Sequence, residues 1–264
     1  MPEGDTIYRA ARTLHAALAG RVITEFESVF SQLARVDHDT PLAGRTIERV
    51  VSEGKHLIMH FSGDLRLRTH MRMHGTWHLY KPGERWQMRH SDMRIVIETD
   101  AWVAVAFNVP VAEFNDDVAI GPDLLAETFD FDEATKRMRA CANEEIADVL
   151  LEQRVVAGIG NEYKNEVLFV ARVDPFARVS ELTDEQLRHI LETARKLMIA
   201  NVTKPGFGRV TTFSLHPRQQ QYVYGRGGQP CRRCGTPVRF AKQGKHARGT
   251  YWCERCQAPA TIQA

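Results

Sequence analysis

The first residues of the chain, Met1, Pro2 and Glu3, combine a candidate nucleophile with a candidate acid. A small second residue normally lets the initiator methionine be removed, which would leave Pro2 with a free secondary amine. Such an amine has a pKa near ~8, so part of it is unprotonated at neutral pH and can attack an electrophilic carbon. Glu3 can supply a general acid one residue away. An ordinary frayed terminus is the alternative, because unanchored chain ends are commonly disordered.

Four of the five cysteines form two pairs with eighteen residues between them: Cys231-x-x-Cys234 and Cys253-x-x-Cys256. This spacing is typical of a zinc ion bound by four thiolates. Disulfides are the alternative, but the N-terminus has acidic Glu3 and Asp5 near its start and no apolar signal core, and the cytosol keeps thiols reduced. We therefore expect one structural Zn²⁺, with Cys141 as a small buried hydrophobic residue.

Basic residues are concentrated at the C-terminal end. Residues 222–264 carry eight Lys or Arg against Glu254 alone, a formal charge of +7, while the rest of the chain carries −5 of the total of +2. A basic module on a mildly acidic body is typical of a nucleic-acid-binding protein. The 264 residues, 43% of them hydrophobic, suffice for two domains. No apolar run is long enough for a transmembrane helix, so we expect no membrane partner.

The first half of the chain predicts one helix followed by strands. Apolar residues recur at helical spacing from Gly4 to Leu18, where Asp5 or Thr6 can cap the start and Gly20 the end. This helix would anchor Pro2. Seven or so β-prone runs then follow: 21–26, 46–53, 56–61, 64–68, 76–80, 93–98 and 101–107. They predict a sandwich or a flattened barrel.

Two stretches among these strands carry further candidates. Lys55 follows a glycine in a turn, where a lysine is usually solvated but can also face a ligand. His70, His74 and His78 are four residues apart and would share a face if one strand held them, although no carboxylates accompany them to suggest a metal site. Met73 fills a core by default, whereas in a nucleic-acid-binding protein an apolar side chain at a loop tip can wedge between bases.

The second half predicts helices and then a zinc ribbon. The helices are expected at 131–141, 144–153, 162–170 and 184–200, and 204–228 as an irregular connection. Gly-Ile-Gly-Asn precedes the third helix, where Asn161 can cap the helix or donate to a phosphate. Strands at 238–240 and 250–252 would form a hairpin with a basic tip. An arginine there can bind a phosphate, although exposed charge often serves only solubility.

These features resemble one family in identity and in order. Met-Pro-Glu-Gly at the terminus, Gly-Ile-Gly-Asn-Glu-Tyr between helices and a terminal four-cysteine ribbon are similar to the formamidopyrimidine-DNA glycosylase / endonuclease VIII family of base-excision repair enzymes. The resemblance covers essentially the whole chain. It implies an α+β fold with four parts: an N-terminal helix plus β-sandwich as the catalytic domain (1–121), a helical domain with a helix–two-turn–helix motif (122–221), the zinc ribbon (222–258) and a tail (259–264).

The resemblance also implies roles for single residues. Pro2 matches the family's N-terminal nucleophile, Glu3 its acid, and Lys55 its lysine in a turn between two strands. Asn161 matches the phosphate-binding asparagine, and Arg248 matches the arginine of the zinc hairpin. The cysteines that match the zinc ligands are Cys231, Cys234, Cys253 and Cys256.

In the family, residues of one loop fill the hole left by a flipped base. The matching residues in this chain are Arg72, Met73 and His74, with Met73 as the wedge. The implied activity is that of a bifunctional DNA glycosylase and abasic-site lyase acting on damaged double-stranded DNA. Pro2 would displace the base through a Schiff base, and β,δ-elimination would cut the strand. We expect a cytoplasmic, nucleoid-associated bacterial monomer that needs no cofactor besides zinc.

The lesion class is a finer expectation. The stretch from Glu3 to Thr6 resembles the endonuclease VIII branch, which favours oxidised pyrimidines. The Arg-x-Phe pair of the oxoguanine branch is missing from the comparable stretch, 107–110. A formamidopyrimidine or 8-oxoguanine glycosylase is the near alternative. A non-enzymatic zinc-ribbon protein that only binds nucleic acid, or an abasic-site lyase or lesion sensor with weak glycosylase activity, are the others.

Overall fold

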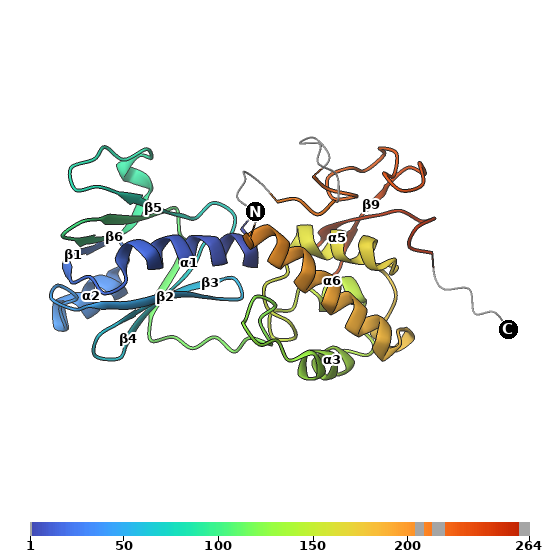
Figure 1. Ribbon diagram of the computed structural model, residues 1–264, viewed down its shortest axis with the longest axis horizontal. Coiled ribbons are helices and arrows are strands. Elements are labelled where there is room, and N and C mark those ends of the chain that lie inside the picture. Colours follow the sequence, from blue (N-terminus) through green and yellow to red (C-terminus); the bar gives the residue numbers. More distant parts are fainter. Residues whose placement is uncertain (1, 204–208, 213–219, 259–264) are drawn as a thin grey trace. The chain divides into compact units, whose positions relative to one another are not determined.

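The computed structural model describes residues 2–203, 209–212 and 220–258, in two compact units, Met1–Ala119 and Ile120–Ala264 (Figure 1). The helices and strands of the first unit are α1 (Gly4–Leu18), β1 (Ile23–Ser28), α2 (Ser31–Asp39), β2 (Ile47–Glu53), β3 (His56–Phe61), β4 (Leu65–His70), β5 (Thr76–Tyr80), the 3₁₀ turn η1 (His90–Asp92), β6 (Met93–Thr99), β7 (Val103–Phe107) and β8 (Val111–Phe114).

The first unit is built on two antiparallel four-stranded sheets, which confirms the predicted sandwich. One sheet has the strand order β1-β6-β7-β5 and the other β2-β3-β4-β8. Alternate residues of the strands point inward, as the period of two requires. A single apolar core joins both sheets with one face of α1, which lies along β2 and β3 in Figure 1.

Helix α1 begins and ends where the sequence predicts. Its buried residues, Ile7, Ala11, Leu14 and Leu18, recur at helical spacing and enter the core. Two contacts show its direction: Val50 N donates to His15 Nδ1 (3.2 Å), and Gly20 N donates to the carbonyl of residue 47 (2.8 Å). Later residues of α1 therefore meet earlier residues of β2. The N-terminus of α1 consequently points toward the end of the sheet where β2 finishes.

Three features of the first unit differ from the sequence expectation. Helix α2 was not predicted, because Leu33 is its only buried residue and the apolar period is too weak to detect. Strand β8 was also missed. The histidines His70, His74 and His78 do not share a strand face: the first ends β4, the second lies in a turn, and the third belongs to β5 of the other sheet.

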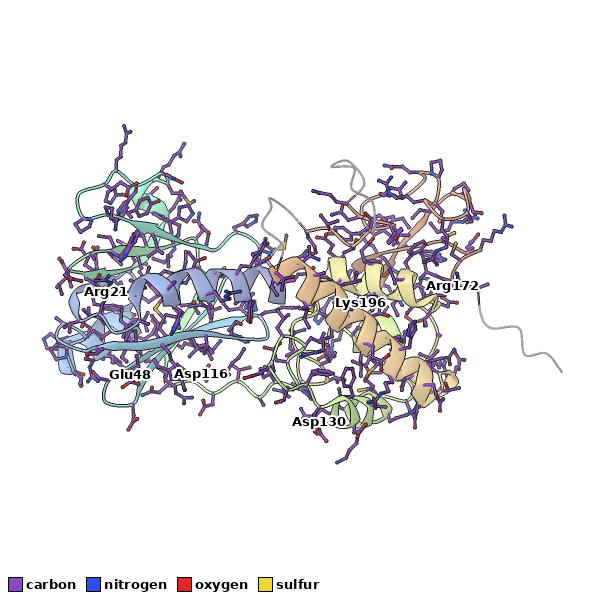
Figure 2. The ribbon with its side chains drawn as sticks, in the orientation of Figure 1. Arg21, Glu48, Asp116, Asp130, Arg172 and Lys196 are labelled. Carbon is purple, nitrogen blue, oxygen red and sulfur yellow. The ribbon has the colours of Figure 1, made fainter. Side chains whose placement is uncertain are left out.

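The second unit contains α3 (Phe131–Arg139), α4 (Ile146–Val149), α5 (Asn161–Ala171), the 3₁₀ turn η2 (Val179–Glu181), α6 (Asp184–Thr203), β9 (Arg239–Gln243) and β10 (Arg248–Trp252). Asp130, labelled in Figure 2, caps α3 by accepting from Glu133 N (2.9 Å). The helices enclose a second apolar core, and none in the described ranges combines the length and hydropathy that crossing a bilayer requires.

The predicted helix at 144–153 is wrong in length, since only the four residues of α4 are helical. The backbone of this segment is committed elsewhere: Ile146 N donates to the carbonyl of Ala177 (2.8 Å), and Glu145 pairs with Arg178 in an isolated β-bridge. Beyond α4, the N–H groups of Leu151 and Glu152 bond three residues back, in tight turns.

Candidate functional site

Pro2 and Glu3 lead directly into α1. Glu3 is the N-cap residue with an extended backbone, and its carbonyl accepts from Thr6 N (2.9 Å) and Ile7 N (3.1 Å). Its side chain is completely buried, and Pro2 is half-buried. The start of the chain is therefore anchored by helix hydrogen bonds, which removes the frayed-terminus interpretation.

Lys55 lies in the tight turn between β2 and β3. Glu53 pairs with His56 across the hairpin, so the turn has two residues, and Gly54 supplies the left-handed conformation (φ 58°) that such turns need. In the next pairing His56 opposes His70, which brings Lys55 beside His70. Because α1 runs antiparallel to β2, Pro2, Glu3 and Lys55 all belong to this end of the sheet.

Two histidines, His56 and His70, lie together beside Lys55, and the sequence reasoning gave neither of them a role there. The rings of His56 and His70 are 4.9 Å apart between centroids. Burial is the largest cause that lowers the pKa of both to about 4. The His70 ring and the Arg68 charge add to the lowering for His56, and the charges of Lys55 and Arg72 add to it for His70. Both are therefore neutral at pH 7, so neither adds an imidazolium charge next to Lys55.

A buried arginine, Arg68, holds this pair of histidines in place. Arg68 donates to His56 Nδ1 (3.1 Å) and is ion-paired with Glu113 and Asp116, the latter labelled in Figure 2. Arg68 is only 6% exposed, so these ion pairs offset part of the cost of burying its charge. The link is a cross-strand one, from β3 through β4 to β8, which no local sequence pattern reveals.

The turn of Arg72, Met73 and His74 connects β4 to β5 and so passes from one sheet to the other. All three residues are exposed, and Met73 retains 55% of its surface, so core filling is excluded for it. His70 Nδ1 accepts from Arg72 N (3.2 Å), and Gly75 N donates to the carbonyl of residue 71 (2.8 Å). A Cβ at Gly75 would lie 2.6 Å from that oxygen, so only glycine fits the close of the turn.

In the second unit, helix α5 packs against strand β10 of the ribbon. Asn161 is the first helical residue, not the cap; Gly160 is the N-cap, so the interpretation of Asn161 as a helix cap is wrong. Its Nδ2 donates to the carbonyl of Gly249 (3.0 Å), whereas its buried Oδ1 has no hydrogen-bond partner within the described part of the chain.

Arg248 begins β10 and is exposed. Residues 248 and 250 share a strand face, and Thr250 Oγ1 accepts from Lys164 Nζ of α5 (2.8 Å). Arg248 therefore projects on the side of β10 that faces α5, near the residue that Asn161 contacts. Over the described ranges its guanidinium has no hydrogen bond or ion pair, so it is available to an anion. The positive end of the α5 dipole favours an anion at the same place.

A buried carboxylate ties α5 to the chain that enters the ribbon. Glu166 accepts from three successive backbone N–H groups, those of Tyr222 (2.7 Å), Val223 (2.8 Å) and Tyr224 (2.8 Å), and from the Thr211 hydroxyl. Complete burial raises the pKa of Glu166, and the four donated bonds oppose that rise.

The sulfur atoms of Cys231, Cys234, Cys253 and Cys256 lie within 4.8 Å of one another, the sole such group of potential metal ligands in the described ranges. The Sγ atoms of Cys231 and Cys256 are 3.9 Å apart and those of Cys234 and Cys253 3.5 Å. A zinc ion at ~2.3 Å from four thiolates gives sulfur–sulfur edges of about 3.8 Å. The donor set thus fits tetrahedral zinc with no open position, so its role is structural.

Removing the zinc is expected to loosen the hairpin, since the apolar cluster of this module is small and includes the zinc ligands Cys231 and Cys253 themselves. Affinity for DNA should then fall about tenfold at ~0.1 M salt, the value of one lost phosphate contact. Fluorescence anisotropy with a duplex carrying an abasic-site analogue measures this, before and after stoichiometric Zn²⁺ is returned. Undiminished binding by the zinc-free protein would contradict the expectation.

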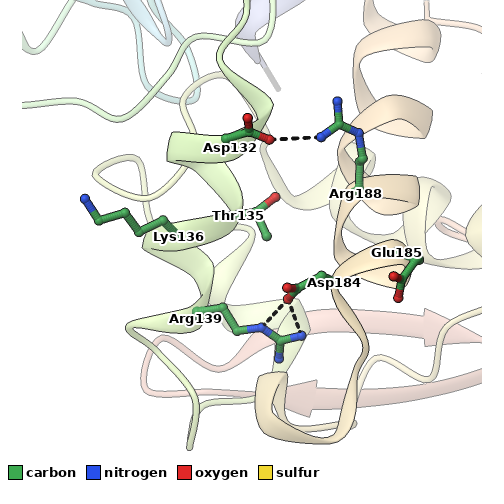
Figure 3. A pocket seen from close by; sticks show the side chains of 7 residues that line it. All are labelled: Asp132, Thr135, Lys136, Arg139, Asp184, Glu185 and Arg188. Carbon is green, nitrogen blue, oxygen red and sulfur yellow. Dashed lines mark hydrogen bonds and ion pairs between the residues drawn. The ribbon is translucent and has the colours of Figure 1, made fainter.

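A polar groove between α3 and α6 is a separate feature (Figure 3). In it Arg139 pairs with Asp184 (2.6 Å) and Arg188 with Asp132 (3.0 Å), while Lys136 points away. Arg139 also donates to two carbonyls of the turn before α6. Because both arginines are engaged, the groove fastens two helices and offers no comparable anion site.

Three family models match the chain. They are the formamidopyrimidine-DNA glycosylase N-terminal domain over residues 1–110, the formamidopyrimidine-DNA glycosylase H2TH domain over 120–212, and the zinc finger found in FPG and IleRS over 228–259. The last of these supports the zinc assignment of the four cysteines.

Relatives of known name are similar over the full length. A probable endonuclease 8 2 of Streptomyces coelicolor is 41% identical over 98% of this chain and 94% of its own. A DNA-(apurinic or apyrimidinic site) lyase Nei2 of Mycolicibacterium smegmatis is 37% identical over 97% of this chain and 99% of its own.

Solved structures share the fold. A complex of the Lactococcus lactis Fpg (MutM) with DNA containing N7-benzyl-Fapy-dG has a TM-score of 0.80 at 22% identity, covering 97% of this chain and 100% of that one. The fold and site thus define a DNA-repair glycosylase, and the chain belongs to the formamidopyrimidine-DNA glycosylase / endonuclease VIII family. Its activities are those of a DNA glycosylase and an abasic-site lyase in base-excision repair.

Proposed function

We propose that the chain excises oxidised pyrimidines from double-stranded DNA through a Schiff base on Pro2 and then cuts the strand by β,δ-elimination. The observation that carries this proposal is the direction of α1. It brings an N-terminal amine and a buried carboxylic acid to the end of the sheet that holds Lys55 and the exposed turn at 72–74.

The glycosylase step follows from these groups. The damaged nucleotide must leave the base stack before its sugar can be reached. The amine of Pro2, freed by loss of Met1, attacks C1′ of the deoxyribose. The C1′–N bond to the base breaks, and the leaving base takes up a proton that balances the one lost from the Pro2 nitrogen. Glu3 gives a proton to the sugar ring oxygen, the ring opens, and an iminium links Pro2 to C1′.

The lyase step consumes that iminium. Loss of a proton from C2′ expels the 3′ phosphate, and a second elimination expels the 5′ phosphate, which leaves a one-nucleotide gap. Hydrolysis of the iminium frees Pro2. Lys55 is suited to holding a flanking phosphate or to assisting protonation of the leaving base. Because His56 and His70 are neutral, no imidazolium charge lies beside the positive charge of Lys55, and this favours the phosphate-binding role of Lys55.

Met73 is suited to entering the hole that the flipped base leaves, with Arg72 and His74 beside it. Its exposure and the tight closure of the turn at Gly75 support this role, because a wedge must be apolar, accessible and rigidly supported.

Asn161 and Arg248 are suited to binding backbone phosphate. We further propose a monomer that acts in the bacterial cytoplasm at the nucleoid, and the four-part division of the chain at 121, 221 and 258.

The pyrimidine preference is supported by the endonuclease 8 names of the relatives and by the connection after β7. Phe107 is buried, and the three residues before β8 are Asn108, Val109 and Pro110. A connection this short that lacks an arginine offers no Arg-x-Phe pair. The oxoguanine branch uses that pair.

A lesion panel with analysis of the product ends tests the proposal. Duplexes carrying 5,6-dihydrouracil or thymine glycol are expected to release their base at least about tenfold faster than a duplex with 8-oxoguanine. This ratio is roughly the selectivity between two substrates that one contact in a binding pocket provides. The products should carry phosphate on both sides of the gap. Preference for 8-oxoguanine would instead establish the formamidopyrimidine-DNA glycosylase alternative. Base release far slower than cutting of abasic DNA would favour the lyase or lesion-sensor alternative.

A further inference from the structure

We propose that Lys164 is a positioning residue that keeps the zinc hairpin in register with α5. With the hairpin held in this way, Asn161 can give up its hydrogen bond to the carbonyl of Gly249 and bind a phosphate while Arg248 stays in place. This inference rests on the proposed function, because it assumes that Asn161 and Arg248 bind phosphate. It concerns a lysine that lies fully buried and so cannot itself touch DNA.

Three side chains of α5 converge on one carbonyl. Gly249 O accepts from Asn161 Nδ2 (3.0 Å), Lys164 Nζ (3.3 Å) and Asn165 Nδ2 (3.3 Å). A carbonyl oxygen has two lone pairs, so three donors exceed what it needs. Asn161 can therefore leave for a phosphate without orphaning Gly249 O, provided that Lys164 and Asn165 remain.

Lys164 also begins a buried polar chain that crosses the hairpin. Its Nζ donates to Thr250 Oγ1 (2.8 Å), whose hydroxyl donates to Gln243 Oε1 (2.6 Å), and Gln243 Nε2 donates to Glu145 Oε2 (2.7 Å). Each strand of the hairpin is thus bonded to the helical part of the unit, β10 through Lys164 and β9 through Glu145 and the carbonyl of Pro175. Such bonds are directional, so they fix orientation where an apolar contact would permit sliding.

The alternative source of orientation, apolar packing, acts on this side of the hairpin at Trp252, at the end of β10 opposite Arg248, where the Trp252 and Phe176 ring centroids are 4.9 Å apart. The inward residues Gln243 and Thr250 are polar, whereas Phe240, on the other face, is 52% exposed. Asn165 adds a second point of registry, because its Oδ1 accepts from Tyr251 N (2.6 Å).

The test combines variants of this chain with removal of Arg248. Lys164→Met removes the donor at similar length. Thr250→Val removes its acceptor without any change of charge or size, so it carries the test if Lys164→Met fails to fold. The matched control is Lys136→Met, which removes a lysine that is exposed on α3 and ion-paired with Glu133 (3.7 Å). Zinc content and thermal melting are measured first, to select folded proteins.

Affinity for an abasic-analogue duplex is then measured as a function of salt, with and without Arg248→Ala. In the wild-type background Arg248→Ala should reduce the magnitude of the slope of log K against log salt by about one. Thr250→Val and Lys164→Met should each lower affinity about threefold to tenfold and reduce the slope. Adding Arg248→Ala to either should then cost less than about threefold, since Arg248 is already displaced.

Two results would separate the inference from its premise. If folded, zinc-loaded Thr250→Val and Lys164→Met bind with the wild-type slope and Arg248→Ala still costs its full factor, Lys164 only stabilises the fold and the inference is wrong. If Arg248→Ala leaves the wild-type slope unchanged, the phosphate role of Arg248 fails, and the inference loses its premise.

Discussion

Protein that keeps an extension ahead of Pro2 is expected to form no covalent adduct with abasic DNA in sodium borohydride. The extension turns the Pro2 nitrogen into a tertiary amide, which has neither a free lone pair nor a proton to lose. Base release should fall by on the order of 10³-fold or more, as expected when a nucleophile is removed. Trapped protein is measured on a denaturing gel with labelled DNA.

The matched control is the same preparation after a protease has removed the extension to leave Pro2 first. Because both samples share every other residue, a difference between them isolates the amine. Mass spectrometry confirms the loss of Met1 or of the extension. Equal trapping before and after cleavage would show that the nucleophile lies elsewhere, and a cleaved protein that binds DNA without trapping would favour the purely nucleic-acid-binding alternative.

Replacing Glu3 with glutamine is expected to slow release of the damaged base by about 10²–10⁴-fold, the usual contribution of a general acid. The amide cannot donate a proton to the sugar ring oxygen, although it preserves the size of a completely buried side chain. Single-turnover base release measures the effect. Glu25→Gln, which alters an exposed carboxylate on β1, is the matched control.

Trapping on abasic DNA provides the internal contrast for Glu3→Gln. An abasic sugar is already partly open as an aldehyde, so imine formation there does not require protonation of the ring oxygen. The variant should therefore keep most of its trapping while losing base release. A variant that loses neither would remove the acid role of Glu3, and one that loses both equally would indicate that Glu3 acts on Pro2 rather than on the sugar.

The elements around the N-terminus could be predicted because local patterns specify them. Helix α1 has the same bounds in sequence and structure, since its apolar residues recur at helical spacing and Gly20 follows it. Strands β3 and β5 also match, because turn residues flank them closely. Helix α2 buries only Leu33. Helix α4 begins later than predicted because residues 144–147 hydrogen-bond to residues 175–179, which are distant in sequence.

The site was predicted less completely than the helices and strands, because several of its contacts join residues that are distant in the sequence. Pro2, Glu3 and the cysteines are recognisable from type and spacing alone. The links through Arg68 join three strands, and those through Lys164 join a helix to a hairpin some 85 residues away, so neither leaves a local pattern. One signal was available: Lys164 and Asn165 follow Asn161 by three and four residues, and such residues share a helix face. The expectation that residues 204–228 are irregular lies partly outside the described residues.

The attachment of the ribbon through Glu166 bears on how the fold responds to oxidation of the zinc ligands. Oxidants that damage bases also attack thiolates and can eject the metal they hold. The carboxylate of Glu166 is inert to such chemistry, and its bonds to the N–H groups of residues 222–224 do not involve sulfur. An oxidised ribbon therefore remains tethered to α5 at its base.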